Sequence, residues 1–298
     1  MKTLWIASLA WALKSSVFHR HRATLLNRSV FLTILCCFFS LKGQTTLVGR
    51  VLDTQSKVPL VYVNIGVVGK EVGTVSDAEG YFSLTLDQPT ERQDSLRFSM
   101  LGYEPKSFLL DQFLEDKPFE IYLNEQAFAL EEVVLISPKK NYKAKLLGNK
   151  TKSNLIYTAF TTNRLGNEMG IVIRGRKDPM WLDYLEFNIV ENDYGPIRFR
   201  LNIYDLKEGL PNQNILTENV FIDTDLERGI VRVDLTPYDL LINEDFFVAL
   251  EWIEDLGPGK LYFSGGFFGN PLIARSVSQG PWKRVGNASL GMQVYVRY

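Results

Sequence analysis

The stretch from Leu47 to Leu86 constrains the fold of this chain more than any other part of the sequence. Short apolar runs alternate there with turn residues, and the densest run is Val61–Val68. Pro59 precedes that run, where its fixed φ and missing N–H are tolerated. Gly73 and Gly80 predict backbone positions with positive φ. Runs of this length without a helical period predict short β-strands joined by tight turns.

A second turn signal and several further runs extend this pattern. Asp77 lies three residues before Gly80, where its carboxylate can accept backbone N–H bonds and leave Phe82 pointing into a core. More short runs follow at Leu96–Met100, Lys106–Leu110 and Phe119–Leu123. Roughly six or seven strands with no intervening helix pattern predict a small sandwich.

Several motifs in this region belong together. They are G-x-V-x-D from Gly49, P-L-x-x-V-N-I from Pro59, G-T-V-S-D-x-x-G-x-F from Gly73, L-G-Y from Leu101 and L-E-E-V-V from Leu130. As a set they resemble the carboxypeptidase-like regulatory domain, a transthyretin-like sandwich of Bacteroidetes envelope proteins. The resemblance implies a seven-stranded, non-catalytic module and places no active site on it.

The second half of the chain continues the β pattern from Leu155 to the last residue. Roughly nine or ten candidate strands separated by Asn, Asp, Gly and Pro turns predict a larger sandwich. The segments RFRLNIYDLKEGLPNQNIL and DFFVALEWIEDL resemble pieces of jelly-roll domains. The predicted fold class is therefore all-β, with two β-sandwich domains in series. The predicted domains are a leader at 1–43, the regulatory-type sandwich at 45–123, a Lys-rich linker at 124–154 and a jelly-roll-like sandwich at 155–298.

The first 43 residues are typical of an export signal. Arg20, Arg22 and Arg28 precede the apolar run Val30–Leu41, which has the length of a signal-peptide core. We therefore expect an exported protein of the periplasm, outer membrane or cell surface. The earlier apolar patch Leu4–Leu13 indicates that the true start lies further along the chain, with an unusually long leader as the alternative. A lipoprotein signal at Cys36 or Cys37 is a weaker alternative, because Leu35 stands where a small residue is needed before Cys36.

Residue counts exclude several classes of chemistry once the leader is removed. Both cysteines and both histidines lie within residues 1–43, so the remaining chain would have no disulfide, no Cys or His zinc site and no Ser-His-Asp triad. The formal net charge of −1 also changes, because the leader contains six basic and no acidic residues. The remaining 27 basic and 34 acidic residues do not favour nucleic acid as a partner.

Aromatic and acidic residues of the second half provide the candidate binding sites. Trp282, Phe267 and Phe268 lie in predicted loops and could form a platform for a glycan, with simple packing as the alternative. Trp252 is predicted to be in the core. Asp223, Asp225 and Glu227 place three carboxylates at alternating positions, which favours either an acidic turn or a calcium site.

Carboxylates also define the enzymatic alternative. A glycosidase needs two of them facing one cleft, but Asp183 and Glu251 are predicted to lie on strands and face solvent. Lys139–Arg164 contains seven basic residues and no acid, which favours a solvated linker or an anchor for anionic glycans or lipid headgroups.

The sequence as a whole predicts a non-enzymatic exported envelope protein that acts as a binding or structural accessory module. Its expected partners are an envelope protein or a glycan, with peripheral membrane association as a further prediction. The first alternative is a carbohydrate-active hydrolase or glycan-binding protein that uses the C-terminal sandwich. The second is an adaptor that accepts a strand at an open sheet edge.

Overall fold

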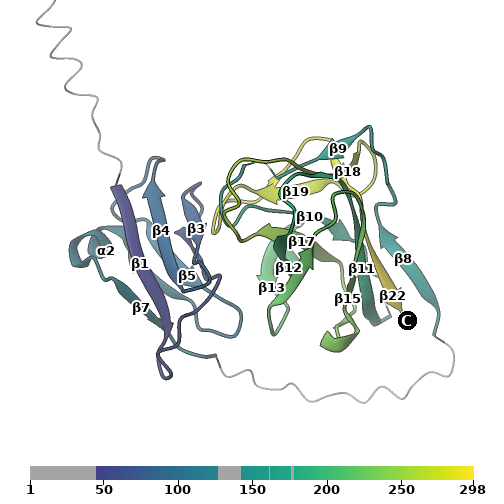
Figure 1. Ribbon diagram of the computed structural model, residues 1–298. Helices are drawn as coiled ribbons and strands as arrows, with labels where there is room; N and C mark the ends of the chain where they lie inside the picture. The colour runs from purple at the N-terminus through teal and green to yellow at the C-terminus, as the bar shows by residue number, and fades with distance from the viewer. Residues whose placement is uncertain (1–44, 127–141, 161, 176–177) are drawn as a thin grey trace, which may run out of the picture. The chain divides into compact units, whose positions relative to one another are not determined.

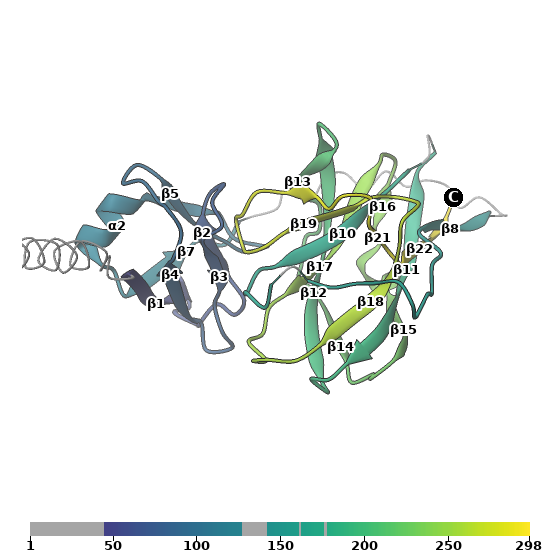
Figure 2. The same ribbon diagram turned by 90° about the horizontal axis from the view of Figure 1, so that it is seen from above.

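The computed structural model describes residues 45–126, 142–160, 162–175 and 178–298. These residues form many short strands (Figures 1 and 2). One α-helix and one 3-10 turn complete the described elements. The strands and both large hydrophobic cores lie in one compact unit, Thr46–Tyr298, with β1 starting one residue earlier. The predicted all-β class is confirmed. The predicted leader and the Leu130–Val134 motif lie outside the described residues.

The N-terminal sandwich is built from a three-stranded and a four-stranded sheet. The three-stranded sheet has the order β4-β1-β7, and β1 and β7 run parallel. The four-stranded sheet has the order β3-β2-β5-β6. The bounds are β1 (Thr45–Asp53), β2 (Asn64–Val67), β3 (Gly73–Val75), β4 (Tyr81–Leu86), β5 (Ser95–Ser99), β6 (Lys106–Leu109) and β7 (Glu120–Leu123).

Strand alternation fills the core of this sandwich. Along β4, Phe82 and Leu84 are buried whereas Tyr81 and Ser83 are exposed, as a half-buried strand requires. Asp77 Oδ1 accepts the N–H groups of Glu79 at 3.0 Å and of Tyr81 at 2.8 Å. The predicted turn and the inward Phe82 are thus confirmed.

One element of this sandwich differs from the prediction. The run expected as a strand to Leu110 ends at Leu109, and α2 (Leu110–Asp116) follows it. Leu110 and Phe113 of this helix are buried in the sandwich core. The helix is short and its two buried residues are spaced by three, a signal too brief to separate from a strand end.

The C-terminal sandwich pairs a seven-stranded with an eight-stranded sheet. In the first, the order is β13-β12-β17-β10-β19-β20, with β14 pairing β12. Its bounds are β10 (Glu168–Ile173), β12 (Ile197–Lys207), β13 (Leu210–Asn214), β14 (Val220–Thr224), β17 (Phe246–Trp252), β19 (Leu272–Arg275) and β20 (Lys283–Arg284).

The eight-stranded sheet is centred on a long strand. Its path is β21-β18-β11-β22-β8, with β15 and β16 pairing β11 and β9 pairing β18. Its bounds are β8 (Ala144–Gly148), β9 (Tyr157–Thr158), β11 (Met180–Asn192), β15 (Gly229–Asp234), β16 (Leu241–Ile242), β18 (Leu261–Gly266), β21 (Ser289–Leu290) and β22 (Met292–Arg297). The 3-10 turn η1 (Thr236–Tyr238) connects β15 to β16.

Residues facing inward from both sheets form the larger core. Phe199, Leu201 and Ile203 alternate along β12 into this core, and Trp252 is buried in it as predicted. The linker predicted at 124–154 includes Ala144–Gly148, which the structure places in β8, paired with β22. None of the described helices is long and apolar enough to cross a membrane.

The two sandwiches contact each other through paired glycines. Gly66 of β2 faces Gly73 of β3, and a Cβ on Gly73 would lie 2.1 Å from the Ser278 carbonyl oxygen. Positive φ was predicted for Gly73, but Gly73 does not have it. The glycine is needed because the Ser278 backbone of the C-terminal sandwich occupies the space of a side chain.

Tyr62 forms a second contact between the sandwiches. It is buried and has a φ of 58°, a left-handed conformation that is costly for an aromatic residue. Its hydroxyl donates to Glu254 Oε1 at 2.8 Å, and its carbonyl accepts a hydrogen bond from Arg200 Nη1 at 2.7 Å. The strained backbone thus presents a carbonyl to a buried arginine.

Candidate functional site

The seven-stranded sheet carries a row of four charged residues on its outer face. The strand register places Arg200 beside Glu251, Glu251 beside Glu168, and Glu168 beside Arg275. The residues next to Arg200 along β12, Phe199 and Leu201, point the opposite way, into the core between the sheets. The row is nonetheless buried, with Glu168 and Glu251 both 0% exposed.

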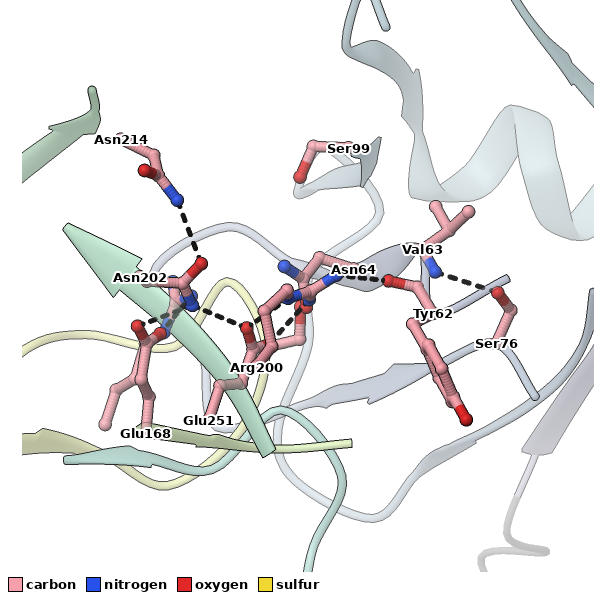
Figure 3. A network of polar contacts seen from close by, with 12 residues as sticks. Tyr62, Val63, Asn64, Ser76, Ser99, Glu168, Arg200, Asn202, Asn214 and Glu251 are labelled. Carbon is pink, nitrogen blue, oxygen red and sulfur yellow. Dashed lines mark hydrogen bonds and ion pairs between the residues drawn. The ribbon is translucent and has the colours of Figure 1, made fainter. Parts of the chain in front are cut away.

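Hydrogen bonds satisfy this row (Figure 3). Arg200 binds both oxygens of Glu251, at 2.8 and 3.0 Å. Asn202 Nδ2 lies 2.9 Å from Glu168 Oε1 and 2.7 Å from Glu251 Oε2, so one amide bridges the two carboxylates. Arg275 Nε donates to Glu168 Oε2 at 2.9 Å. The two arginines at the ends of the row therefore neutralise the two glutamates between them.

Burial and charge act in opposite directions on the two carboxylates. Burial raises the pKa of Glu168. The positive charge of Arg275 lowers this pKa and the negative charge of Glu251 raises it, and the net shift is upward. For Glu251, burial also raises the pKa, but the charge and hydrogen bonds of Arg200 outweigh it and the pKa lies below its usual value. The two glutamates are thus electrostatically different although they are neighbours.

These contacts make the row a structural feature. Arg200 is covered by the Tyr62 carbonyl, and Arg275 lies 4.7 Å from the ring of Trp282. Glu251 was predicted to face solvent, and this prediction is wrong because the N-terminal sandwich and the Trp282 loop cover that face. The other acid predicted to face solvent, Asp183, is partly buried and paired with Arg297.

The outer face of the eight-stranded sheet contains a small pocket at an irregularity of β11. The pairing of β11 with β18 shifts between Ile189 and Glu191, which indicates a β-bulge. Consecutive strand residues normally point to opposite faces, but Val190 and Glu191 both line the pocket. A bulge redirects side chains in this way and often does so beside functional sites.

Two tyrosines form the wall of this pocket. Tyr262 of β18 lies opposite Glu191, and Tyr157 of β9 packs against it with ring centroids 4.5 Å apart. Tyr157 is 55% exposed. Ser153 positions the segment before β9, because its hydroxyl accepts the N–H of Ile156 and its carbonyl accepts a hydrogen bond from Ser264.

The rest of the pocket is polar. Its volume is about 200 Å³, and Asn154 and Arg228 complete the lining. Within the described residues, neither of these two side chains has a protein partner, while Glu191 is held by Lys260 at 3.3 Å. An aromatic wall beside unpaired amide and guanidinium groups is suited to a small polyhydroxylated ligand.

Another aromatic pair on this face is less accessible. Tyr184 lies between Tyr295, whose parallel ring is 4.7 Å away, and Arg232, which is 4.5 Å from its centroid. Both faces of the Tyr184 ring are therefore covered. Tyr157 presents a freer ring surface because Tyr262 is the one ring found against it among the described residues.

The three predicted glycan-platform residues have different environments. Trp282 is partly buried against Tyr204 and Phe247, with ring centroids at 5.7 and 5.3 Å. Phe267 and Phe268 are 62% and 93% exposed. The structure does not bring Trp282 together with the two phenylalanines in one aromatic cluster of the described residues.

The three residues predicted as calcium ligands also have different environments. Asp223 forms a two-point ion pair with Arg198, at 2.6 and 2.9 Å. Asp225 lines the same surface cleft as Asp223, whereas Glu227 is exposed and does not line it. No group of three or more His, Cys, Asp or Glu able to hold a metal is found in the described ranges.

Glu191 and Tyr262 are two of the many acids and aromatics of the second half, and no sequence signal joins them. None singles out Tyr157, Asn154 or Arg228 either. The bulge depends on pairing between β11 and β18, which are about 70 residues apart along the chain. A local pattern carries no signal for that pairing.

The described residues thus form two all-β sandwiches, and the second carries a polar pocket with an aromatic wall. Residues 47–135 match the family model of the CarboxypepD_reg-like domain. The N-terminal sandwich is therefore a domain of this family, as its motifs predicted, and the C-terminal sandwich lies beyond the match. A regulatory-type domain joined to a second sandwich with a pocket fits a binding or accessory module.

Comparison with curated proteins finds no significant match. Among solved structures, the chain is similar to the cysteine protease and lectin-like domains of Cwp84, a surface layer associated protein of Clostridium difficile, at 11% identity and a TM-score of 0.37. That similarity covers 85% of this chain and 63%, less than two thirds, of the other. A second structure of the Clostridial protease, after propeptide cleavage, gives 12% identity, a TM-score of 0.38 and coverage of 87% and 72%.

Proposed function

We propose that this chain is a non-enzymatic, exported accessory protein of the cell envelope that binds a glycan in the pocket walled by Tyr157 and Tyr262. The observation that carries the proposal is the bulge of β11, which brings Glu191 to an exposed tyrosine pair. A sugar ring has apolar faces that pack on an aromatic ring and hydroxyls that need planar polar partners. Asn154, Glu191 and Arg228 supply those partners.

The arrangement of carboxylates supports binding rather than hydrolysis. Among the described residues, Glu191 is the one carboxylate that lines this pocket, and Lys260 contacts both Glu191 at 3.3 Å and Asp193 at 3.9 Å. Glu168 and Glu251 share the amide of Asn202, but both are fully buried. A glycosidase needs two carboxylates that reach one bound sugar. The hydrolase alternative therefore requires a second acid, such as Asp193, to reach the bound sugar, but Glu191 is the one described acid that lines the tyrosine pocket.

Export supports the envelope setting and rests on the leader predicted at 1–43. The basic residues and the apolar run Val30–Leu41 are the observations behind it. Fractionation of the source cells tests this part by itself. Recovery of the chain in the cytoplasm with residues 1–43 intact would contradict export but would leave the pocket proposal standing.

The binding proposal is tested on an immobilised panel of plant and bacterial cell-wall oligosaccharides, followed by calorimetry with each sugar that binds. We expect Tyr157→Ala to weaken binding by at least about tenfold, because it removes the exposed wall of the pocket. Glu191→Gln should weaken it as well. Tyr81→Ala, which removes an exposed tyrosine from the N-terminal sandwich, is the matched control.

Three outcomes would contradict the proposal. The first is that no sugar on the panel binds, and the second is that Tyr157→Ala and Tyr81→Ala have equal effects. The third is release of reducing ends from a bound oligosaccharide in a way that depends on Glu191, which would favour the hydrolase.

A further inference from the structure

The turn between β18 and β19 holds two adjacent phenylalanines in solvent. Phe267 is 62% exposed and Phe268 93% exposed. In the described part of the chain neither ring packs on another ring, and neither lies in a hydrophobic cluster. Single exposed apolar residues are common, but two adjacent exposed phenylalanines at one turn are costly unless something covers them.

The fold holds this turn in place. Asn149 Oδ1 accepts the N–H of Asn270 at 2.8 Å, and Asn149 Nδ2 donates to the carbonyls of Asn270 at 2.9 Å and Leu290 at 3.0 Å. Ser289 donates to the Phe268 carbonyl at 3.2 Å. Gly269 has a φ of 115°, and a Cβ there would lie 2.4 Å from Asn149 Oδ1. The hydrogen bonds of Asn149 and Ser289 therefore fix the backbone of the turn that holds the two rings in solvent.

The segment that clamps the turn is basic and apolar. Lys150 directly follows Asn149, and Lys150 and Lys152 are both exposed, with no ion pair to any described residue. Leu155 is 92% exposed, and the next residue accepts a hydrogen bond from Gly265 at the end of β18. Two phenylalanines, a leucine and two free lysines thus lie on two adjacent backbone segments.

We infer that this docking turn, comprising Phe267, Phe268, Leu155, Lys150 and Lys152, binds the surface of an anionic phospholipid bilayer. The rings would enter the boundary between headgroups and acyl chains, and the lysines would contact lipid phosphates. Charge complementarity selects this occupant. The exposed groups are apolar or cationic, whereas a glycan needs the amide and carboxylate partners that the tyrosine pocket supplies.

The inference assigns Phe267 and Phe268 a role different from the glycan platform predicted for them. It is independent of the tyrosine pocket, because no residue of the docking turn lines that pocket. It also uses Lys150 and Lys152, two of the seven basic residues of the segment predicted as an anchor, beside apolar side chains. Apolar contact and charge together give reversible membrane binding, which neither provides alone.

The test is sedimentation with vesicles, using residues 45–298 so that the apolar run Val30–Leu41 contributes nothing. This part retains both hydrophobic cores and all of their strands. We expect binding to vesicles of equimolar phosphatidylcholine and phosphatidylglycerol, and at least about tenfold weaker binding to phosphatidylcholine alone. High salt should weaken binding to the anionic vesicles and leave binding to the phosphatidylcholine vesicles unchanged.

Two double variants and their matched controls identify the residues. Phe267→Ser with Phe268→Ser should lower affinity for the anionic vesicles by about tenfold or more. Lys150→Glu with Lys152→Glu should lower it similarly and remove the salt dependence. Tyr81→Ser with Phe119→Ser is the control for two exposed rings, and Lys117→Glu with Lys207→Glu is the control for two exposed charges.

Several results would overturn the inference. They are absence of binding to the anionic vesicles, equal binding to both vesicle types, salt-independent binding, and equal losses in the docking variants and their controls. Binding of Phe267 and Phe268 to a sugar of the oligosaccharide panel, lost in the double phenylalanine variant, would return these residues to the glycan platform.

Discussion

The two outer faces of the C-terminal sandwich carry similar polar and aromatic residues in opposite states. On the seven-stranded sheet, Arg200, Glu251, Glu168 and Arg275 are buried, paired and covered. On the eight-stranded sheet, Tyr157 and Arg228 are exposed, and Arg228 has no partner in the described chain. Residue type alone therefore does not distinguish a covered, fully paired group from an open one.

The comparison also shows what the N-terminal sandwich contributes. Its Tyr62 carbonyl and its glycine pair meet the C-terminal sandwich at the covered face. An ionic row on an open sheet would be solvated and would contribute little. When the row is covered, every charge in it must have a partner, because an unpaired buried charge is strongly unfavourable. The contact between the sandwiches therefore depends on these ion pairs. The regulatory-type domain is thus part of the structure that supports the sandwich bearing the pocket.

The largest effect is expected when a buried charge on the covered face loses its partner. Glu251→Ala leaves Arg200 buried without its carboxylate and should lower the free energy of unfolding by about 3–5 kcal/mol. Urea unfolding measures the loss. The control is the double variant Arg200→Met with Glu251→Leu, which removes both charges and should recover much of the stability. A loss below about 1 kcal/mol for Glu251→Ala would mean that the row is solvated.

A smaller effect is expected where the sandwiches touch without charge. Gly73→Ala places a Cβ 2.1 Å from the Ser278 carbonyl oxygen and should cost about 1–3 kcal/mol, because backbone on both sides must shift. Gly280→Ala, whose Cβ would lie 3.0 Å from the nearest atom, should cost less. Thermal unfolding of both variants measures the difference. Equal melting temperatures would contradict the contact between Gly73 and Ser278.

The smallest effect concerns an exposed ion pair. The hydrogen bond from Arg198 lowers the pKa of Asp223. Because the folded pKa lies below the unfolded one, the stabilisation is present above the unfolded pKa and is lost as pH falls through the folded pKa. Solvent screening keeps it below about 1 kcal/mol. Unfolding of Asp223→Asn should therefore match the wild type at low pH and differ slightly at neutral pH. A difference that grows on acidification would contradict this sign.

Much of the fold could be predicted because its signals are local. The Asp77 turn, the alternation around Phe82 and the buried Trp252 depend on neighbours within a few residues, and all three are confirmed. Helix α2 and strand β8 were missed because one is too short to show a period and the other lies in a Lys-rich stretch that resembles a linker. Glu251 was misplaced because alternation tells which residues leave the core and not what covers them.

The sequence by itself determined the all-β class, the family of the N-terminal sandwich and the positions of its main turns, since turn chemistry and strand alternation act over a few residues. Tertiary structure decided which face is covered and which is open. Gly73 needs no positive φ and is a glycine because Ser278, some 200 residues later, occupies the place of its side chain. The tyrosine pocket likewise exists because β11 bulges against β18, a long-range pairing that no local pattern specifies.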